Sequence, residues 1–155
     1  MRTVDQLLAE APAFEGMSPE HLELIAGCGR NEVYEVGAYL LREGDPADRF
    51  YVLRRGHVAM EIFAPQRGAI TVETIGPGDL LGWSWLVPPF RANLDARAVE
   101  ETHALSFDAA CLRGKCDEDP VLGYELMRRF IPVIAERLQA TRVRLLDLYG
   151  HAGAA

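Results

Sequence analysis

Between residues 33 and 107 the chain breaks into short β-rich runs that are separated by turns containing glycine. The runs follow one another at intervals of about 8–12 residues, a spacing typical of sandwiches and barrels built from many short strands. Tight corners favour glycine because its backbone reaches φ > 0 without a steric penalty. The pattern therefore predicts about eight strands in a mainly β fold. The turn glycines are Gly37, Gly44, Gly56, Gly78 and Gly82.

Helical patterns flank the β-rich region on both sides. Residues 1–30 indicate two short helices, and Ser18 is placed to cap the second. After the strands, Asp108 can cap a short helix that runs through Leu112, and Asp119 opens a long helix that we expect to end at about Tyr149. These parts divide a single predicted domain, 1–155, into N-terminal helices at 1–30, a β-barrel at 31–108 and C-terminal helices at 109–150.

The last helix carries two apolar stripes. One follows alternating steps of three and four residues, the a/d seam of a coiled coil. We expect the other stripe to cover the barrel and the seam to face a second copy of the chain in a homodimer. The alternative is one wide stripe buried in a monomer. The seam contains Tyr124, Met127, Ile131, Ile134, Leu138, Thr141, Leu145 and Leu148, and the barrel-facing stripe contains Leu122, Leu126, Phe130 and Val133.

Charge and composition limit the classes of function. The 155 residues carry a net charge of −7, and a field of that sign repels phosphate backbones, so unaided DNA or RNA binding is not expected. No apolar run reaches the roughly 18 residues needed to cross a bilayer. The N-terminus lacks the apolar core of a secretory signal. We expect a cytoplasmic protein that does not enter the membrane.

The three cysteines are Cys28, Cys111 and Cys116. An odd number without a framework spacing predicts free thiols in a reducing compartment. A metal site would need a fourth ligand that the sequence does not offer.

The stretch from Leu41 to Val58 resembles the cyclic-nucleotide-binding domain family: a strand, a Gly-Asp turn, a small residue and an acid, then an aromatic-rich strand that ends in a glycine turn. The resemblance covers roughly residues 12–149, and the layout is similar to the sensor half of the catabolite-activator type of bacterial regulator. It implies a β-roll or jelly-roll barrel, a regulatory role without catalysis, and cyclic AMP or cyclic GMP as candidate ligands. In those regulators a helix-turn-helix domain follows the long helix, and none follows it in this sequence.

The cassette that holds the phosphate in that family corresponds to residues 78–92, and here it departs from the family pattern. Trp83 stands where the pattern has the glutamate that holds the ribose. Arg91 is the natural candidate for the phosphate arginine, but one extra residue before the next strand shifts its register. The candidate ligand-binding residues are Gly82, Trp83, Ser84, Trp85, Arg91 and Ala92.

Three hypotheses about function remain open. The first is a ligand-responsive homodimeric sensor, and the second is a ligand-free module whose aromatic cassette docks a protein partner. The third is a half-regulator that pairs with a DNA-binding chain. The indoles of Trp83 and Trp85 could stack on a purine, fill the pocket themselves or belong to the core. The sequence offers no catalytic constellation, and the arginines of the last helix are interpreted as a solvated or snorkelling face in preference to a nucleic-acid patch. These arginines are Arg128, Arg129, Arg137, Arg142 and Arg144.

Overall fold

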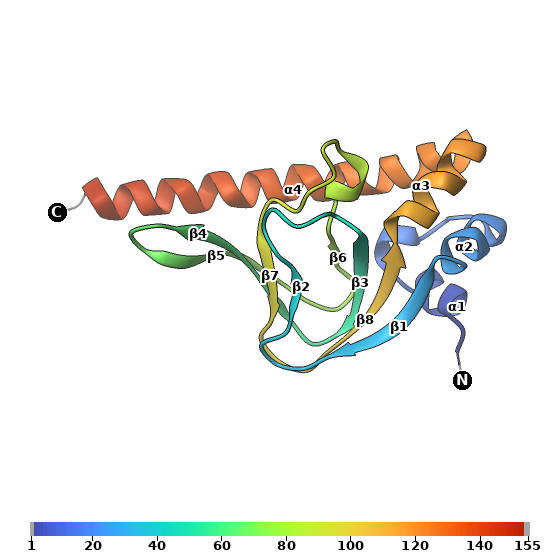
Figure 1. Cartoon of the computed structure of the whole chain (residues 1–155), viewed down its shortest axis with the longest axis horizontal. Coiled ribbons are helices and arrows are strands. Elements are labelled where there is room, and N and C mark those ends of the chain that lie inside the picture. Colours follow the sequence, from blue (N-terminus) through green and yellow to red (C-terminus); the bar gives the residue numbers. More distant parts are fainter. Residues whose placement is uncertain (1, 154–155) are drawn as a thin grey trace.

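The computed structural model describes residues 2–153, with side chains as far as residue 150. Within this range eight strands form two sheets, and helices cover one side of them (Figure 1). The helical elements are α1 (Val4–Ala9), η1 (Pro12–Phe14), α2 (Pro19–Ala26), η2 (Ser84–Leu86), α3 (Ala109–Glu118) and α4 (Pro120–Gly153). The strands are β1 (Gly29–Tyr34), β2 (Tyr39–Leu41), β3 (Arg49–Arg55), β4 (Val58–Ala64), β5 (Gly68–Ile75), β6 (Leu80–Leu81), β7 (Asp95–Ala98) and β8 (Thr102–Asp108).

Each sheet contains four antiparallel strands. The first has the order β1-β8-β3-β6 and the second the order β2-β7-β4-β5. Neighbours in a sheet are mostly distant in sequence, as in β1, which pairs with β8 from Gly29↔Phe107 to Tyr34↔Thr102. This double-sheet roll with flanking helices confirms the predicted fold class.

Strands β3, β6 and β8 of the first sheet are buried on both faces, whereas the edge strand β1 is largely exposed. Successive residues of β3 alternate between two cores, as expected for a strand whose side chains point to opposite faces. Tyr51 and Leu53 pack between the two sheets, whereas Phe50 and Val52 pack against the helices. The helical core reaches from Leu8 in α1 to Phe130 in α4. The helices therefore form a third layer on the outer face of the first sheet.

Three predicted caps are confirmed. The backbone N–H of His21 donates to Ser18 Oγ at 3.3 Å at the start of α2. Asp108 Oδ1 accepts from the Cys111 N–H at 2.9 Å, and Asp119 Oδ1 accepts from the Leu122 N–H at 3.2 Å. Each cap satisfies a donor that the first turn of a helix leaves unpaired.

Two helix ends differ from the prediction. α3 continues to Glu118, well past its first turn, and α4 continues past Tyr149 to Gly153. Gly150 has no positive φ, so it does not act as a left-handed terminator. α4 also continues through Pro132 as one uninterrupted helix.

The exposures on α4 match the two predicted stripes. Leu122, Leu126 and Phe130 are fully buried against the first sheet and its helices. On the seam, Ile131 is 61% exposed and Leu138 is 52% exposed. One stripe therefore covers the barrel, and most of the seam lies open in the single chain, although Ile134 and Leu148 are half-buried.

The prediction of three free thiols is wrong for two of them. Cys28 and Cys111 form a disulfide that links positions 83 residues apart, with their Cα atoms 5.8 Å apart. The Asp108 N–H donates to the Cys28 carbonyl at 2.8 Å, so the start of α3 is held beside the end of α2. Cys116 is free and half-buried.

The predicted turn glycines all occupy positive φ. Gly56, between β3 and β4, has the least room of these. Its φ is +88°, and a Cβ would lie 2.5 Å from the Glu101 carbonyl oxygen and 2.8 Å from the Thr102 Cα. Both the backbone conformation and the close approach of β8 therefore require glycine at this corner.

We expect Gly56→Ala to lower the free energy of unfolding by about 2–4 kcal/mol, because left-handed strain and a backbone clash act together. Gly114→Ala in α3 is the matched control, since a Cβ there meets no atom within 4 Å. It should raise stability by roughly 0.5–1 kcal/mol through helix propensity. Urea unfolding of both variants measures the difference, and equal stabilities would contradict the assignment of Gly56.

Candidate functional site

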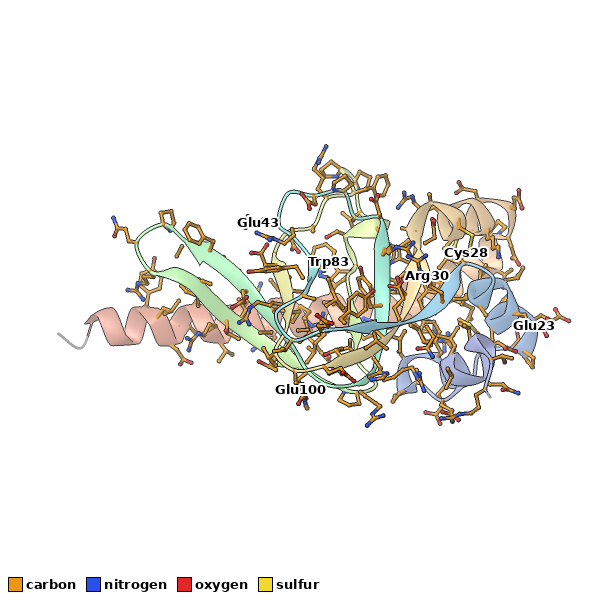
Figure 2. The ribbon with its side chains drawn as sticks, turned by 60° about the horizontal axis from the view of Figure 1, so that its bottom comes forward. Glu23, Cys28, Arg30, Glu43, Trp83 and Glu100 are labelled. Atoms are coloured by element: carbon orange, nitrogen blue, oxygen red, sulfur yellow. A yellow bond between two sulfur atoms is a disulfide. The ribbon has the colours of Figure 1, made fainter. Side chains whose placement is uncertain are left out.

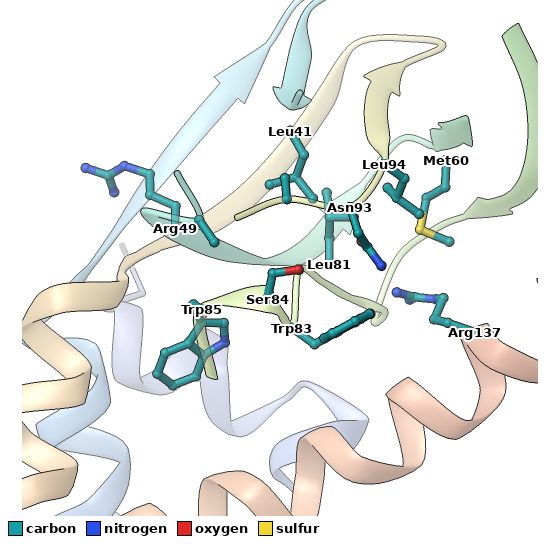
Figure 3. Close-up of a pocket in the computed structure, with 13 residues that line it drawn as sticks. Leu41, Arg49, Met60, Leu81, Trp83, Ser84, Trp85, Asn93, Leu94 and Arg137 are labelled. Atoms are coloured by element: carbon teal, nitrogen blue, oxygen red, sulfur yellow. The ribbon is translucent and has the colours of Figure 1, made fainter. Parts of the chain in front are cut away.

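A small cavity lies where the cassette meets the inside of the roll and α4 (Figure 3). Its volume is about 20 Å³, enough for about one water molecule. Most of the wall is apolar, with Leu41 from β2, Met60 from β4 and Leu81 from β6. The charged and polar side chains that line it are those of Arg49, Ser84, Asn93 and Arg137.

Trp83 closes the lower side of this cavity. It is half-buried and precedes η2 directly, so its backbone is fixed where β6 turns at Gly82. Figure 3 shows its indole extending from η2 toward the guanidinium of Arg137. Gly82, with φ +92°, lines the same cavity, as does Ser84, which is 8% exposed. Five of the six predicted ligand residues line this cavity, namely Gly82, Trp83, Ser84, Trp85 and Ala92.

Trp85 belongs mainly to the hydrophobic core, although it contributes to the cavity wall. It is 1% exposed. Its ring stacks on Phe50 at a centroid distance of 4.9 Å and meets Phe130 edge-on at 5.5 Å. In Figure 3 it points away from Trp83, toward the helices. A residue packed in this way cannot present its ring to a docking protein without opening the core.

Arg91 lies outside the cavity. It is exposed, and its Nη1 donates to the Gly44 carbonyl at 2.9 Å. Ala92, the next residue, is buried and lines the cavity, and its N–H donates to the Asp45 carbonyl at 2.9 Å. The backbone at the end of the cassette therefore directs Ala92 into the cavity and Arg91 outward, toward the Gly44-Asp45 turn.

Arg137 is the cationic residue that α4 places in the cavity wall. Its side chain is 12% exposed, with Nε 3.3 Å from Glu73 Oε2 and Nη2 2.6 Å from the Leu80 carbonyl. Burial lowers the pKa of the guanidinium, and the Glu73 carboxylate opposes that shift. This arginine was interpreted from sequence as solvated, and that interpretation is wrong. Residue 137 continues the spacing of the buried stripe Leu122, Leu126, Phe130 and Val133. That spacing was the feature of the sequence that could have predicted a buried arginine.

We expect Arg137→Ala to lower the free energy of unfolding by about 2 kcal/mol, because it removes a charged hydrogen bond and leaves Glu73 without its partner. Arg142→Ala, on the exposed part of the same helix, should stay within about 0.5 kcal/mol of the parent. Thermal unfolding of both variants tests this expectation. If the two substitutions cost the same, Arg137 does not fasten α4 to the roll.

Arg113 of α3 holds the cassette from its other side. Its Nη1 donates to the Trp85 carbonyl at 2.8 Å. Its guanidinium also lies over the Phe90 ring, 4.5 Å from the centroid, a favourable cation–π geometry. Sequence reasoning missed this contact because two strands, β7 and β8, separate the cassette from Arg113 along the chain.

Other kinds of site are not found in the described part of the chain. Residues 2–153 contain no group of three or more His, Cys, Asp or Glu side chains that could hold a metal ion. No helix among these residues has the length and hydropathy needed to cross a membrane.

A two-sheet roll, a glycine-bounded cassette and a long C-terminal helix define a class of small sensor domains. The cyclic nucleotide-binding domain model matches residues 31–119, and the chain belongs to that family. The CRP-like cAMP-activated global transcriptional regulator of Mycobacterium tuberculosis is 28% identical over 145 residues. This match covers 94% of the present chain and 63% of the regulator, so the chain spans less than two thirds of its relative's length.

Solved structures agree with this fold. A cyclic nucleotide-binding domain from Methylobacillus flagellatus superimposes with a TM-score of 0.77 at 19% identity, covering 93% of this chain and 81% of that one. The catabolite activator protein of Thermus thermophilus gives a TM-score of 0.68 at 24% identity, covering 89% of this chain and 63% of that one. At these identities the likeness establishes the fold alone.

Proposed function

We propose that the chain is a non-catalytic regulatory module that acts as a homodimer through α4, and that its own Trp83 fills the ligand pocket of the fold. The observation that carries the proposal is the cavity of only about 20 Å³ that this indole lines. Pockets that hold small organic ligands usually measure about 300–1,000 Å³. The relatives found by sequence and by fold are regulators or nucleotide-binding domains, which supports a regulatory role.

A cyclic nucleotide does not fit the residues present. Trp83 replaces the expected carboxylate, and Arg91 is directed to the Gly44 carbonyl instead of into the cavity. A nucleotide would first have to displace the indole. Its apparent affinity would then be its intrinsic affinity multiplied by the small fraction of molecules in the open conformation. We therefore propose that cyclic AMP and cyclic GMP are not the physiological ligands of this module.

We expect Trp83→Ala to create a cavity on the order of 100 Å³, the size class in which apolar cavities take up an aromatic molecule. Millimolar indole should then raise the melting temperature of the variant and leave the parent unchanged, since only the variant has a vacant site. Phe63→Ala is the matched control, because Phe63 is 62% exposed and its removal opens no cavity. A parent protein that responds to indole as strongly as Trp83→Ala would contradict a filled pocket.

The homodimer is supported by the open seam of α4. Tyr124, Met127, Ile131, Leu138 and Leu145 are each at least half exposed, on the side of the helix that does not contact the sheet. Solvent exposure of so many large apolar side chains along one helix is unfavourable, and a second copy of the same helix can bury them in a coiled-coil packing.

We expect the parent to sediment as a dimer at micromolar concentration and the double variant Leu138→Glu, Leu145→Glu to sediment as a monomer, because each glutamate would place a charge in the seam. Gln139→Glu adds one such charge outside the seam and should leave the dimer intact. Analytical ultracentrifugation distinguishes these results. A monomeric parent, or a double variant that stays dimeric, would rule out this interface.

The docking of a partner enzyme through the aromatic cassette receives less support, because Trp85 is buried. We propose a cytoplasmic location and no direct contact with nucleic acid, and the net charge of −7 supports the latter.

A further inference from the structure

The disulfide Cys28–Cys111 joins two parts of the helical layer at a point that solvent can reach. Cys28 lies just after α2 and is 7% exposed. Cys111 lies in the first turn of α3 and is exposed. Figure 2 places Cys28 at the junction of the N-terminal helices with α3. One sulfur is therefore sheltered, while the residue that carries the other is open to a reagent.

We propose that the Cys28–Cys111 pair is a reversible thiol–disulfide site, and that its redox state is passed to the cassette through α3. The proposal goes beyond the proposed function, since it requires neither a filled pocket nor a dimer. Disulfides in reducing compartments are usually transient and redox-sensing, and exposed ones are the more labile.

The reaction needs a dithiol reductant. One of its thiolates attacks the sulfur of Cys111 and forms a mixed disulfide, while Cys28 leaves as a thiolate and takes a proton from water. The second thiol of the reductant then attacks the reductant's sulfur atom in the mixed disulfide and releases Cys111 as a thiol. Two electrons pass to the protein, which gains two thiols, and the reductant leaves as its disulfide.

The surroundings of Cys111 favour release of its thiolate. Cys111 occupies the N-terminal turn of a ten-residue helix, where the helix dipole stabilises negative charge. Lys115 lies one turn further on, on the same face of α3, and its Nζ donates to the Leu24 carbonyl at 2.6 Å. The ammonium therefore lies close to the junction that the disulfide closes.

The third cysteine does not compete for this chemistry. Burial raises the pKa of the Cys116 thiol, and Asp117 and Asp119 raise it further. A thiol with a raised pKa is a poor nucleophile at neutral pH. Five residues separate Cys116 from Cys111, so the two do not share a helical face. Exchange is therefore directed to the Cys28–Cys111 pair.

α3 provides a short physical connection from this pair to the cassette. Arg113 is two residues after Cys111, and it donates to the Trp85 carbonyl at 2.8 Å while covering the Phe90 ring. The disulfide and the Lys115–Leu24 hydrogen bond hold the same helix against α2. Reduction removes the covalent contact, so α3 and the guanidinium of Arg113 become freer to move away from η2.

The experiment uses intact protein and dithiothreitol. When the chain is unfolded in guanidinium before alkylation, the air-oxidised protein should present one thiol to iodoacetamide and the reduced protein three, counted by mass spectrometry. Both tryptophans of the chain lie in the cassette, so their fluorescence reports on it. We expect reduction to shift the emission to the red and to increase quenching by acrylamide, and reoxidation to reverse both changes.

Three variants make the test specific. Cys111→Ser should show the reduced emission in either buffer, and Cys116→Ser should respond as the parent does. Arg113→Ala should keep the change in thiol number and lose most of the emission shift. Far-UV circular dichroism confirms that the reduced chain remains folded.

The proposal is overturned if all three thiols of the air-oxidised protein react. It is also overturned if the emission is the same in both redox states, or if reduction abolishes the circular dichroism of the fold. A full emission shift in Arg113→Ala would refute the route through α3. None of these results depends on the oligomeric state or on cyclic nucleotide binding, so the outcome is separate from that of the proposed function.

Discussion

An aromatic cluster connects the first sheet to the cassette and to the long C-terminal helix α4. Phe50 of β3 stacks on Trp85 of η2 at 4.9 Å and on Phe107 of β8 at 4.7 Å, and Phe130 of α4 meets Phe50 edge-on at 5.1 Å. Aromatic pairs of this geometry contribute roughly 0.5–1.5 kcal/mol each beyond the area that they bury. Because one ring comes from the cassette and one from the long helix, the cassette cannot move far without disturbing the packing of α4.

The same arrangement explains why the pocket is closed. Trp85 anchors η2 in the core, Arg113 holds the Trp85 carbonyl from α3, and Arg137 fastens α4 to β6 next to Trp83. Trp83 is then the side chain that remains to fill the space between them. The family fold is retained, while the groups that would hold a nucleotide are replaced or turned outward. On our proposal, these contacts would pass a change in the helical layer to the cassette and to α4.

Local sequence features were reliable predictors of this fold. The strand count, the caps at Ser18, Asp108 and Asp119, and the positive φ of the turn glycines each depend on residues close together in the chain. The misses depend on tertiary contacts. Cys28 and Cys111 are 83 residues apart, and no spacing rule pairs them. β1 begins at Gly29, earlier than its β-rich residues indicate, because only glycine allows the Phe107 ring to lie over that position. The inward turn of Arg137 and the outward turn of Arg91 follow from the packing of α4 and of the Gly44 turn.

The central claim is that the chain's own indole occupies the space that a cyclic nucleotide would need. Calorimetric titration of the ligand-stripped protein with cyclic AMP and cyclic GMP tests it most directly, with Arg91→Ala as the control. We expect no saturable heat with either nucleotide at concentrations up to about 1 mM. The free energy of any binding would then be less favourable than about −4 kcal/mol. Micromolar binding that Arg91→Ala abolishes would contradict the claim, because it would mean that the cassette opens and that Arg91 turns inward to hold a phosphate.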